Sequence, residues 1–355
     1  METAYVALES GRVVEARSRA PGTTRGELVF TTAYTGYEES LTDPSYEEQV
    51  LTFSYPLIGN YGVREERFES DRVHPRAVVA RELTDDVAEW LTEEDVPAID
   101  HLDTRDLVTG IREEGAMKCG IAAGPDATEA AAREELSACK GMSEHTDIGQ
   151  QVSVAKRHTH NPNGDGPHVA LVDCGAKGSI TSSLVERDAV VDVLPYDATA
   201  ADVEHLDPDI LFISNGPGDP ENFTAAHALV EEFVGEVPLA GICLGQQVIA
   251  GALDGETEKM DFGHRGVNQP VRDLRSGRVV MTTQNHGYTV SEPGQLEVTQ
   301  VNVNDDTVEG LDSDELDVIT RQYHPEANPG PNDSLDFFDD VLALAEDAED
   351  AELTA

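Results

Sequence analysis

After residue 168, short apolar runs alternate with helical patterns, and this alternation limits the possible folds more than any other feature. Two helical patterns, over Ser182–Glu186 and His227–Val234, separate runs that have the length of strands. The predicted strands are Val169–Asp173, Val190–Leu194, Ile210–Ser214 and Val237–Cys243. Strands that alternate with helices are typical of βαβ units, which build a parallel sheet with helices on both faces. Ligands bind such sheets at the carboxyl ends of the strands.

The first half of the chain has a different pattern, which is rich in strands. The predicted strands are Tyr5–Leu8, Val13–Val14, Leu28–Ala33 and Gln49–Phe53. The predicted helices lie at Val87–Leu91, Thr104–Glu114 and Thr128–Ser137. A chain of 355 residues is long enough for two domains. We therefore expect an α/β protein with a β-rich first domain.

A polar segment marks the expected boundary between the domains. Residues 158–167, from His158 to Pro167, have the composition of a loop and no apolar periodicity. We expect an N-terminal domain over residues 1–157, a linker over 158–167 and a second domain over 168–344. Residues 345–355 are rich in acidic side chains, and we expect them to form a frayed, solvated tail.

The charge of the chain is unusual. The chain contains 70 Asp and Glu residues but 24 Lys and Arg residues, so its formal net charge is −46. Only five of the basic residues are lysines. This surface would repel nucleic acid and anionic membranes, which argues against both as partners. Because concentrated salt screens self-repulsion, the composition predicts adaptation to molar salt. The alternative is an ordinary acidic protein.

Features of several other protein classes are missing from the sequence. The cysteines, at positions 119, 139, 174 and 243, form no C-x-x-C pair, which argues against a zinc ribbon or a thioredoxin-like site. The chain does not begin with a secretory pattern, and no apolar run approaches about 18 residues. Gly175–Ser179 only faintly resembles a phosphate-binding loop. We therefore expect a cytoplasmic protein with free thiols and no metal or nucleotide site on this chain.

The segment Gly241–Gln247, with the sequence G-I-C-L-G-Q-Q, lies where the last predicted strand meets a helix-compatible stretch. It is the thiol form of the G-x-S-x-G turn, which places a nucleophile between a strand and a helix. Glycines flank the nucleophile because the turn strains the backbone and leaves no space for side chains. A helix N-terminus favours a thiolate, and the N–H of Leu244 is placed to stabilise an oxyanion. Cys243 is therefore a candidate nucleophile; the alternative is a buried core cysteine in a tight turn.

A possible base for this thiol lies in the segment Tyr323-His324-Pro325-Glu326. Pro325 favours extended backbone at His324, and residues two apart on an extended segment point to the same side. Glu326 can then accept a hydrogen bond from one imidazole nitrogen while the other nitrogen faces the thiol. Considered alone, a His beside a Pro is more often a residue of a surface loop.

Two further loops are candidates for the same site. Ser214–Pro220 follows a predicted strand and is rich in Gly and Pro, so it can present backbone N–H groups to a ligand. Gln284–Tyr288 follows a strand predicted over Val279–Thr283. The alternatives are an ordinary turn for the first loop and a polar hairpin end for the second.

Taken together and in this order, the four motifs are similar to those of the triad (class I) glutamine amidotransferases. The first half contains two further distinctive segments, Thr35–Tyr46, with the sequence T-G-Y-E-E-S-L-T-D-P-S-Y, and Tyr55–Gly62. With these segments, the first half resembles the N-terminal domain of the small subunits of carbamoyl-phosphate synthases. The resemblance implies a β-rich N-terminal domain followed by an amidotransferase domain with a central, mostly parallel sheet flanked by helices.

The resemblance also implies the chemistry of the site. Cys243 would attack the side-chain amide of L-glutamine to form a thioester, His324 would act as acid and base, and Glu326 would orient His324. The N–H groups of Gly216 and Leu244 would stabilise the oxyanion. The residues implied to contact glutamine are Ser45 (from the front domain), Gly216, Gly218, Leu244, Gln247, Asn285, Gly287 and Tyr288.

The implied partner is the large subunit of the synthase. Ammonia would pass to it through a channel, and it would make carbamoyl phosphate from bicarbonate and ATP for arginine and pyrimidine synthesis. ATP and Mg would bind to that partner, and no cofactor is implied on this chain. The sequence departs from the family pattern at Gln246, where His is common, at Tyr288, where Phe is common, and at Tyr323, where Gly is common.

Two other functions compete with this interpretation. One is a stand-alone cysteine amidohydrolase or the glutaminase of a different synthase, which the T-G-Y…D-P-S-Y segment argues against. The other is a non-catalytic scaffold, which the presence of Cys243, His324 and Glu326 argues against.

Overall fold

The computed structural model describes residues 2–354, and the chain divides into two compact units. The first unit ends at His145 and also contains Asp261–Gly266, and the second begins at Thr146. The division precedes residue 157, where the sequence placed the domain boundary, because residues 146–157 are bound to the second unit. Val154 N–H donates to Asp173 Oδ2 (2.7 Å), and Tyr196 N–H donates to Ser153 Oγ (2.9 Å). The functional boundary at residue 157 stays a prediction.

The first unit is built on a closed barrel with the strand order β1-β2-β8-β6-β4-β3-β9. Closure leaves no strand edge free for unwanted pairing. The barrel strands are β1 (Thr3–Leu8), β2 (Val13–Ala20), β3 (Gly22–Thr31), β4 (Gln49–Phe53), β6 (Ala77–Val79), β8 (Ala98–Asp100) and β9 (Met117–Ala123). A separate short sheet pairs β5 (Leu57–Ile58) with β7 (Glu82–Leu83). The β-rich character expected of this half is confirmed.

Helices cover the barrel because its strands bury both of their faces. In β3, Leu28 packs in one apolar cluster with α3, and the next residue, Val29, packs in a second cluster with α2. Burial on both faces explains why Leu28–Phe30 of β3 is a continuous apolar run. The helices are α1 (Tyr37–Leu41), α2 (Asp85–Glu93), α3 (Thr104–Glu114) and α4 (Glu129–Ser137), with 3₁₀ helices η1 (Pro44–Tyr46), η2 (Glu65–Arg67) and η3 (Met142–Glu144).

The second unit contains a ten-stranded sheet in the order β10-β12-β11-β13-β14-β19-β18-β17-β15-β16. From β12 to β19 the neighbouring strands are parallel, as the alternation of strands and helices predicts. From β19 to β15 they are antiparallel. The strands are β10 (His158–His160), β11 (His168–Asp173), β12 (Val190–Pro195), β13 (Ile210–Ile213), β14 (Leu239–Ile242), β15 (Glu256–Asp273), β16 (Val279–Glu292), β17 (Glu297–Asn302), β18 (Val308–Ser313) and β19 (Val318–Arg321).

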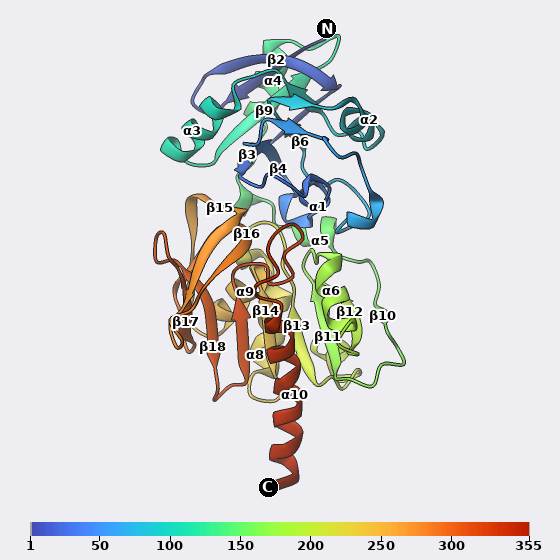
Figure 1. Ribbon diagram of the computed structural model, residues 1–355, viewed down its shortest axis with the longest axis vertical. Coiled ribbons are helices and arrows are strands. Elements are labelled where there is room, and N and C mark those ends of the chain that lie inside the picture. The colour runs from blue at the N-terminus through green and yellow to red at the C-terminus, as the bar shows by residue number, and fades with distance from the viewer. Residues whose placement is uncertain (1, 355) are drawn as a thin grey trace. The chain divides into compact units, whose positions relative to one another are not determined.

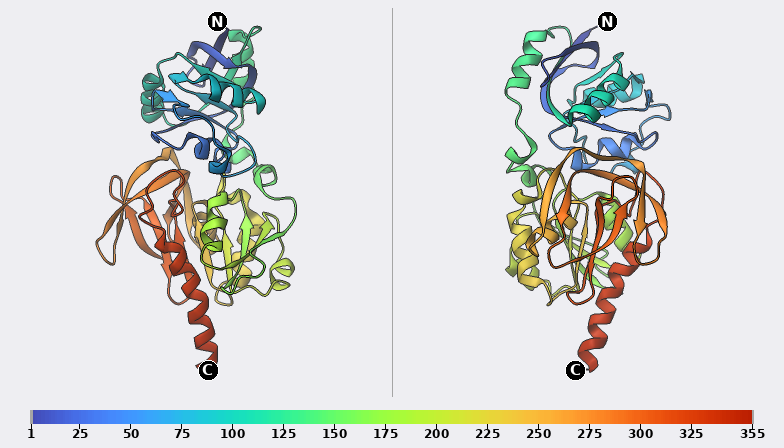
Figure 2. Two further views of the ribbon diagram at one scale, coloured as in Figure 1. Left: turned by 45° about the vertical axis from the view of Figure 1, so that its right-hand side comes forward. Right: turned by 90° about the vertical axis from the view of Figure 1, so that its left-hand side faces the viewer.

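Helices cover both faces of the parallel part, which confirms the predicted fold class. Helices α6 and α10 lie on one face, and α8 and α9 lie on the other (Figures 1 and 2). On the first face Leu184 of α6 and Phe338 of α10 share an apolar cluster with Phe212 of β13. The helices of this unit are α5 (Ile148–Val152), α6 (Gly178–Val185), α7 (Ala200–Glu204), α8 (Thr224–Phe233), α9 (Leu244–Ala252) and α10 (Asp336–Thr354), with a 3₁₀ helix η4 (Pro220–Asn222).

Two segments differ from the sequence-based expectation. His158–His160, expected in a linker, forms β10 and pairs antiparallel with β12 at the edge of the sheet. The acidic C-terminal run, expected to be frayed, continues α10 to Thr354. The first turns of α10 are held by packing of Phe337, Phe338 and Val341 in the core. Among the described residues, no helix combines the length and the apolar character that crossing a membrane requires.

Candidate active site

Cys243 lies at the turn between β14 and α9, as the G-x-C-x-G pattern predicts. Its backbone has φ 56° and ψ −105°, a strained conformation for a residue with a side chain. Both flanking glycines are required by space. A Cβ at Gly245 would lie 2.1 Å from Ile213 O, and a Cβ at Gly241 would lie 2.8 Å from the carbonyl carbon of Gly245.

The thiol of Cys243 is buried and directed toward β16. Its backbone N–H donates to Arg321 O (2.7 Å), so the turn is anchored to the end of β19. The thiol donates to the backbone carbonyl of Asn285 at 3.7 Å. The residue is 2% exposed, so its side chain is shielded from bulk solvent.

His324 and Glu326 follow β19 and make the contact expected from their spacing. His324 Nδ1 lies 2.6 Å from Glu326 Oε1, and both side chains are buried. The backbone N–H of His324 donates to Thr283 O (2.8 Å), which fixes the start of this segment against β16. His324 Nε2 has no hydrogen bond of ordinary length among the described residues.

The electrostatics of this pair depend on its neighbours. Burial opposes the charged ring of His324, but the Glu326 carboxylate and the nearby Cys243 side chain outweigh burial and raise the pKa of His324 to about 10. Burial also opposes the charge of Glu326, but Lys177 and His324 lower the pKa of Glu326 to about 2. At neutral pH the ring is therefore protonated and the carboxylate is ionised.

Lys177 is a component of the site that motif analysis does not single out. It lies in the turn between β11 and α6, directly before the first residue of α6, and it is 2% exposed. Its ammonium group donates to Glu326 Oε1 (3.1 Å) and to Ala327 O (2.6 Å). The signal in the sequence was weak: one of only five lysines lies four positions after the end of a predicted strand.

The loop after β13 is bound to the same turn. Asn215 Oδ1 accepts from Lys177 N–H (3.0 Å), and Ser214 Oγ accepts from Cys174 N–H (2.9 Å). Only glycine fits at position 216, because a Cβ there would lie 2.1 Å from Cys174 O. Gly218 has φ 88°, which also favours glycine.

The remaining predicted glutamine-binding residues gather around β16 and α9. Gln247 Nε2 donates to Tyr288 O (2.8 Å) and to Gln322 Oε1 (3.0 Å). The sequence predicted a strand that ends at Thr283, but β16 continues to Glu292, so the predicted strand end was wrong. The strand therefore contains Asn285, Gly287 and Tyr288. The polar side chains inside it have hydrogen-bond partners in the protein; for example, His286 Nδ1 lies 2.8 Å from Tyr288 O.

Two predicted residues stand apart from this group. Leu244 is the first residue of α9, next to Cys243, and is 2% exposed. Ser45 belongs to the first unit, in η1, where its N–H donates to Asp43 Oδ1 (2.9 Å). Its contact with the substrate stays a prediction.

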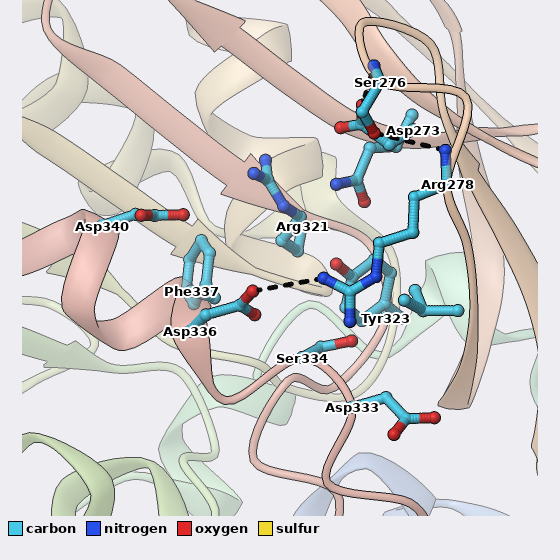
Figure 3. A pocket seen from close by; sticks show the side chains of 12 residues that line it. Asp273, Ser276, Arg278, Arg321, Tyr323, Asp333, Ser334, Asp336, Phe337 and Asp340 are labelled. Atoms are coloured by element: carbon cyan, nitrogen blue, oxygen red, sulfur yellow. Dashed lines mark hydrogen bonds and ion pairs between the residues drawn. The ribbon is translucent and has the colours of Figure 1, made fainter.

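The second unit also contains a polar pocket, shown in Figure 3. It is lined by residues that lie around the hairpin between β15 and β16, the end of β19 and the start of α10, including Arg278, Arg321, Tyr323 and Asp336. Arg278 lies 3.8 Å from Asp336 across it. None of the residues that line this pocket is a predicted site residue. The candidate active site is therefore assigned from the positions of Cys243, His324 and Glu326 and not from this pocket.

Comparison with family models supports the same class of protein. The model described as glutamine amidotransferase class-I matches residues 170–344, which include Cys243, His324 and Glu326. The model described as the CPSase domain of the carbamoyl-phosphate synthase small chain matches residues 6–121. The second unit is thus a class-I glutamine amidotransferase domain.

Full-length relatives define the family. The carbamoyl phosphate synthase small chain of Halobacterium salinarum is 71% identical over 346 residues, which cover 98% of each chain. The small chain of Archaeoglobus fulgidus is 43% identical and covers 95% of this chain and 97% of its own. The chain belongs to the carbamoyl phosphate synthase small chains. This confirms the predicted glutamine-hydrolysing subunit, and the salt-adapted composition fits the halobacterial relative.

Proposed function

We propose that Cys243, His324 and Glu326 are the residues that hydrolyse L-glutamine in this subunit. The observation that carries the proposal is a strained, glycine-flanked cysteine whose side chain lies near a buried imidazole, and Nδ1 of that imidazole contacts a carboxylate at 2.6 Å. Nucleophile, base and orienting group are the three parts of a triad.

The reaction proceeds in two halves. The thiolate of Cys243 attacks the side-chain carbonyl carbon of glutamine, and the C=O electrons move to oxygen. His324 then gives its proton to the departing nitrogen, the C–N bond breaks, and ammonia leaves a γ-glutamyl thioester. His324 next takes a proton from water, the hydroxide attacks the thioester, and glutamate and the thiolate are released.

The neighbouring backbone and side chains supply binding. The N–H groups of Leu244 and Gly216 stabilise the oxyanion. Leu244 directly follows the nucleophile, and Gly216 lies in the loop after β13. The glutamine pocket is formed by Gly218, Gln247, Asn285, Gly287 and Tyr288 of the second unit. Gln247 supports this role because its amide already bonds to Tyr288 O and holds β16 against α9.

The partner is the large subunit of the same synthase, in a heterodimer contacted by the N-terminal domain. Ammonia passes to it through a protected channel, because ammonia released into neutral water becomes ammonium, which has no free electron pair. ATP and Mg act on the large subunit, where carbamoyl phosphate for arginine and pyrimidine synthesis is made. The complex works in the cytoplasm.

Substitution of Cys243 by Ala in the small–large complex tests this proposal. We expect glutamine-dependent carbamoyl phosphate synthesis to fall to background, while ammonia-dependent synthesis stays at the wild-type rate. Cys139→Ala is the matched control and keeps both activities, because Cys139 belongs to the first unit and to none of the motifs of the proposed glutaminase site. Loss of both activities in Cys243→Ala would mean that Cys243 is structural.

A further inference from the structure

The edge strand β10 carries two histidines on one face of the second unit's sheet. His158 pairs with Val193 of β12, and His160 pairs with Val191. Residues directly opposite in an antiparallel pair share a face, and so do residues two apart along one strand. Both valines are buried in the core, whereas both histidines are exposed. The two imidazole rings therefore continue the core face of the sheet outward, beyond its last buried strand.

The two rings lean toward each other. Their Cα atoms are two strand positions apart, a separation of about 6.6 Å. The Nε2 atoms of His158 and His160 nevertheless lie only 3.0 Å apart, and the ring centroids are 4.8 Å apart with the ring planes at 70°. Between two neutral rings this contact is an N–H···N hydrogen bond, in which one ring donates and the other accepts.

The same distance fits two ligands of one metal ion. Two imidazole nitrogens bound about 2.0 Å from an ion lie about 2.8 Å apart in adjacent square-planar positions and about 3.3 Å apart in tetrahedral positions. The observed 3.0 Å lies between these two values. To bind the ion, both neutral rings carry their proton on Nδ1 and leave the lone pair of Nε2 for the metal.

The strand is held in place from its other face. Thr159 lies between the two histidines, and its Oγ1 donates to Asp192 Oδ1 at 2.7 Å. The other oxygen of Asp192 lies 2.8 Å from His168 Nε2. Among the described residues, neither ring of the histidine pair forms a hydrogen bond or an ion pair with a carboxylate. The backbone is thus fixed, while the two converging nitrogens contact only each other.

The kind of ion follows from the donor atoms. Imidazole nitrogen suits Cu²⁺, Ni²⁺ and Zn²⁺, whereas Mg²⁺ and Ca²⁺ prefer oxygen ligands. Two protein nitrogens do not complete the coordination of any of these ions, so water fills the remaining positions.

We propose that His158 and His160 form a two-histidine chelating site for a divalent transition-metal ion at the edge of the second unit's sheet. The expectation of no metal site on this chain came from a sequence in which both histidines lay in a linker, and the pairing of β10 with β12 changes that. The site shares no residue with the proposed glutaminase site. A bound ion stabilises the extended form of β10, because only that form brings the two nitrogens together.

Titration of the untagged full chain with Ni²⁺ in molar KCl, followed by calorimetry, tests the proposal. We expect one site that requires both rings, so His158→Ala and His160→Ala each weaken Ni²⁺ binding about 10–100-fold. The double variant loses little more than either single variant, because one imidazole alone cannot chelate. Zn²⁺ competes for the site, and a large excess of Mg²⁺ does not. His205→Ala, which removes another exposed histidine of the same unit, is the matched control and binds like the wild type.

A second readout reports chelation alone. Nickel held on a nitrilotriacetate resin offers two adjacent free positions, so it should retain the untagged wild type and His205→Ala but release both single variants early. Equal binding by the wild type and the single variants would overturn the proposal, because it would show an adventitious ion only. Small and independent losses in the two single variants would also overturn it, since each ring would then bind an ion by itself.

Discussion

His324 Nδ1 and Glu326 Oε1 lie 2.6 Å apart in a region where both side chains are almost fully buried. In that setting the carboxylate decides which nitrogen of the ring bonds to it, so Nε2 is left for the thiol and the substrate. A hydrogen bond to an ionised group is also stronger than a neutral one. In the proposed mechanism, the reactivity of Cys243 therefore depends on the Glu326 carboxylate, which acts through His324.

Replacement of Glu326 by Gln tests this dependence. Gln has nearly the same shape and can still accept a hydrogen bond, but it cannot balance the charge that develops on His324. We expect kcat for glutamine-dependent synthesis to fall about 10–1000-fold, with little change in ammonia-dependent synthesis. Steady-state rates with each nitrogen source measure this. Glu258→Gln, at an exposed position of β15, is the control, and equal rates in both variants would contradict the role of Glu326.

The turn around Cys243 should not tolerate a methyl group at Gly245. An added Cβ would meet backbone, 2.1 Å from Ile213 O, and backbone cannot move aside without shifting β13. We expect Gly245→Ala to lower the free energy of unfolding by about 1–3 kcal/mol and to reduce glutaminase activity. Denaturant unfolding at constant KCl gives the first value.

Gly110→Ala is the matched control for that variant. Gly110 lies inside α3, and a Cβ there would meet nothing within 4 Å. Alanine favours helix over glycine by about 0.5–1 kcal/mol, so this variant should be more stable than the wild type. Equal behaviour of the two alanine variants would contradict the close approach at Gly245.

Asp100 should stabilise the barrel of the first unit in a pH-dependent way. It is buried and accepts two hydrogen bonds of 2.7 Å from Arg17. Burial raises its pKa, but Arg17, the Leu83 N–H and Arg19 outweigh burial and leave the pKa below its usual value. Because the folded-state pKa is depressed, the stabilisation is present above about pH 4 and is lost as the pH falls through the folded-state value.

The comparison of Asp100→Asn with the wild type measures this contribution. We expect a loss of about 3 kcal/mol at pH 7, and a smaller difference between the two proteins at pH 3. Asp85→Asn is the control, since Asp85 also bonds to Arg19 but is fully exposed, and it should change stability little. A difference between Asp100→Asn and wild type that is constant from pH 7 to pH 3 would contradict the account.

The net charge of −46 predicts that salt stabilises this protein. The screening length falls from about 10 Å at 0.1 M to about 3 Å at 1 M, so repulsion between neighbouring carboxylates is reduced in molar KCl. We expect Tm to rise between about 0.2 and 2 M KCl. A parallel series in sucrose separates screening from general solute effects. A maximum of Tm below about 0.2 M KCl would contradict adaptation to salt.

Local patterns predicted the elements that carry the proposed catalytic residues. The glycines around Cys243 are required by contacts within a few residues and with one neighbouring strand, so the turn could be predicted from its own sequence. The contact between His324 and Glu326 was also local, because extended backbone places residues two apart on one side. The βαβ alternation likewise predicted β11–β14 and the helices α6 and α8, but it missed the short helix α7.

Features that depend on distant contacts could not be predicted. The ion pair between Lys177 and Glu326 joins residues 149 positions apart, so neither residue indicates the other. The polar run Gln284–Tyr288 did not suggest the interior of a strand, since part of what holds it lies far away in the chain, such as Gln247 of α9, which donates to Tyr288 O. His158–His160 has loop composition and pairs only because β12 presents a free edge.

Selective labelling of Cys243 tests the central claim most directly. The folded small–large complex in molar KCl is incubated with a diazo-ketone analogue of glutamine, and the adduct is located by peptide mass. The account predicts modification of Cys243, protection by glutamine, and no modification of Cys119, Cys139 or Cys174. Labelling of the other cysteines at the same rate, or an unlabelled Cys243 in a complex that still forms carbamoyl phosphate from glutamine, would contradict it.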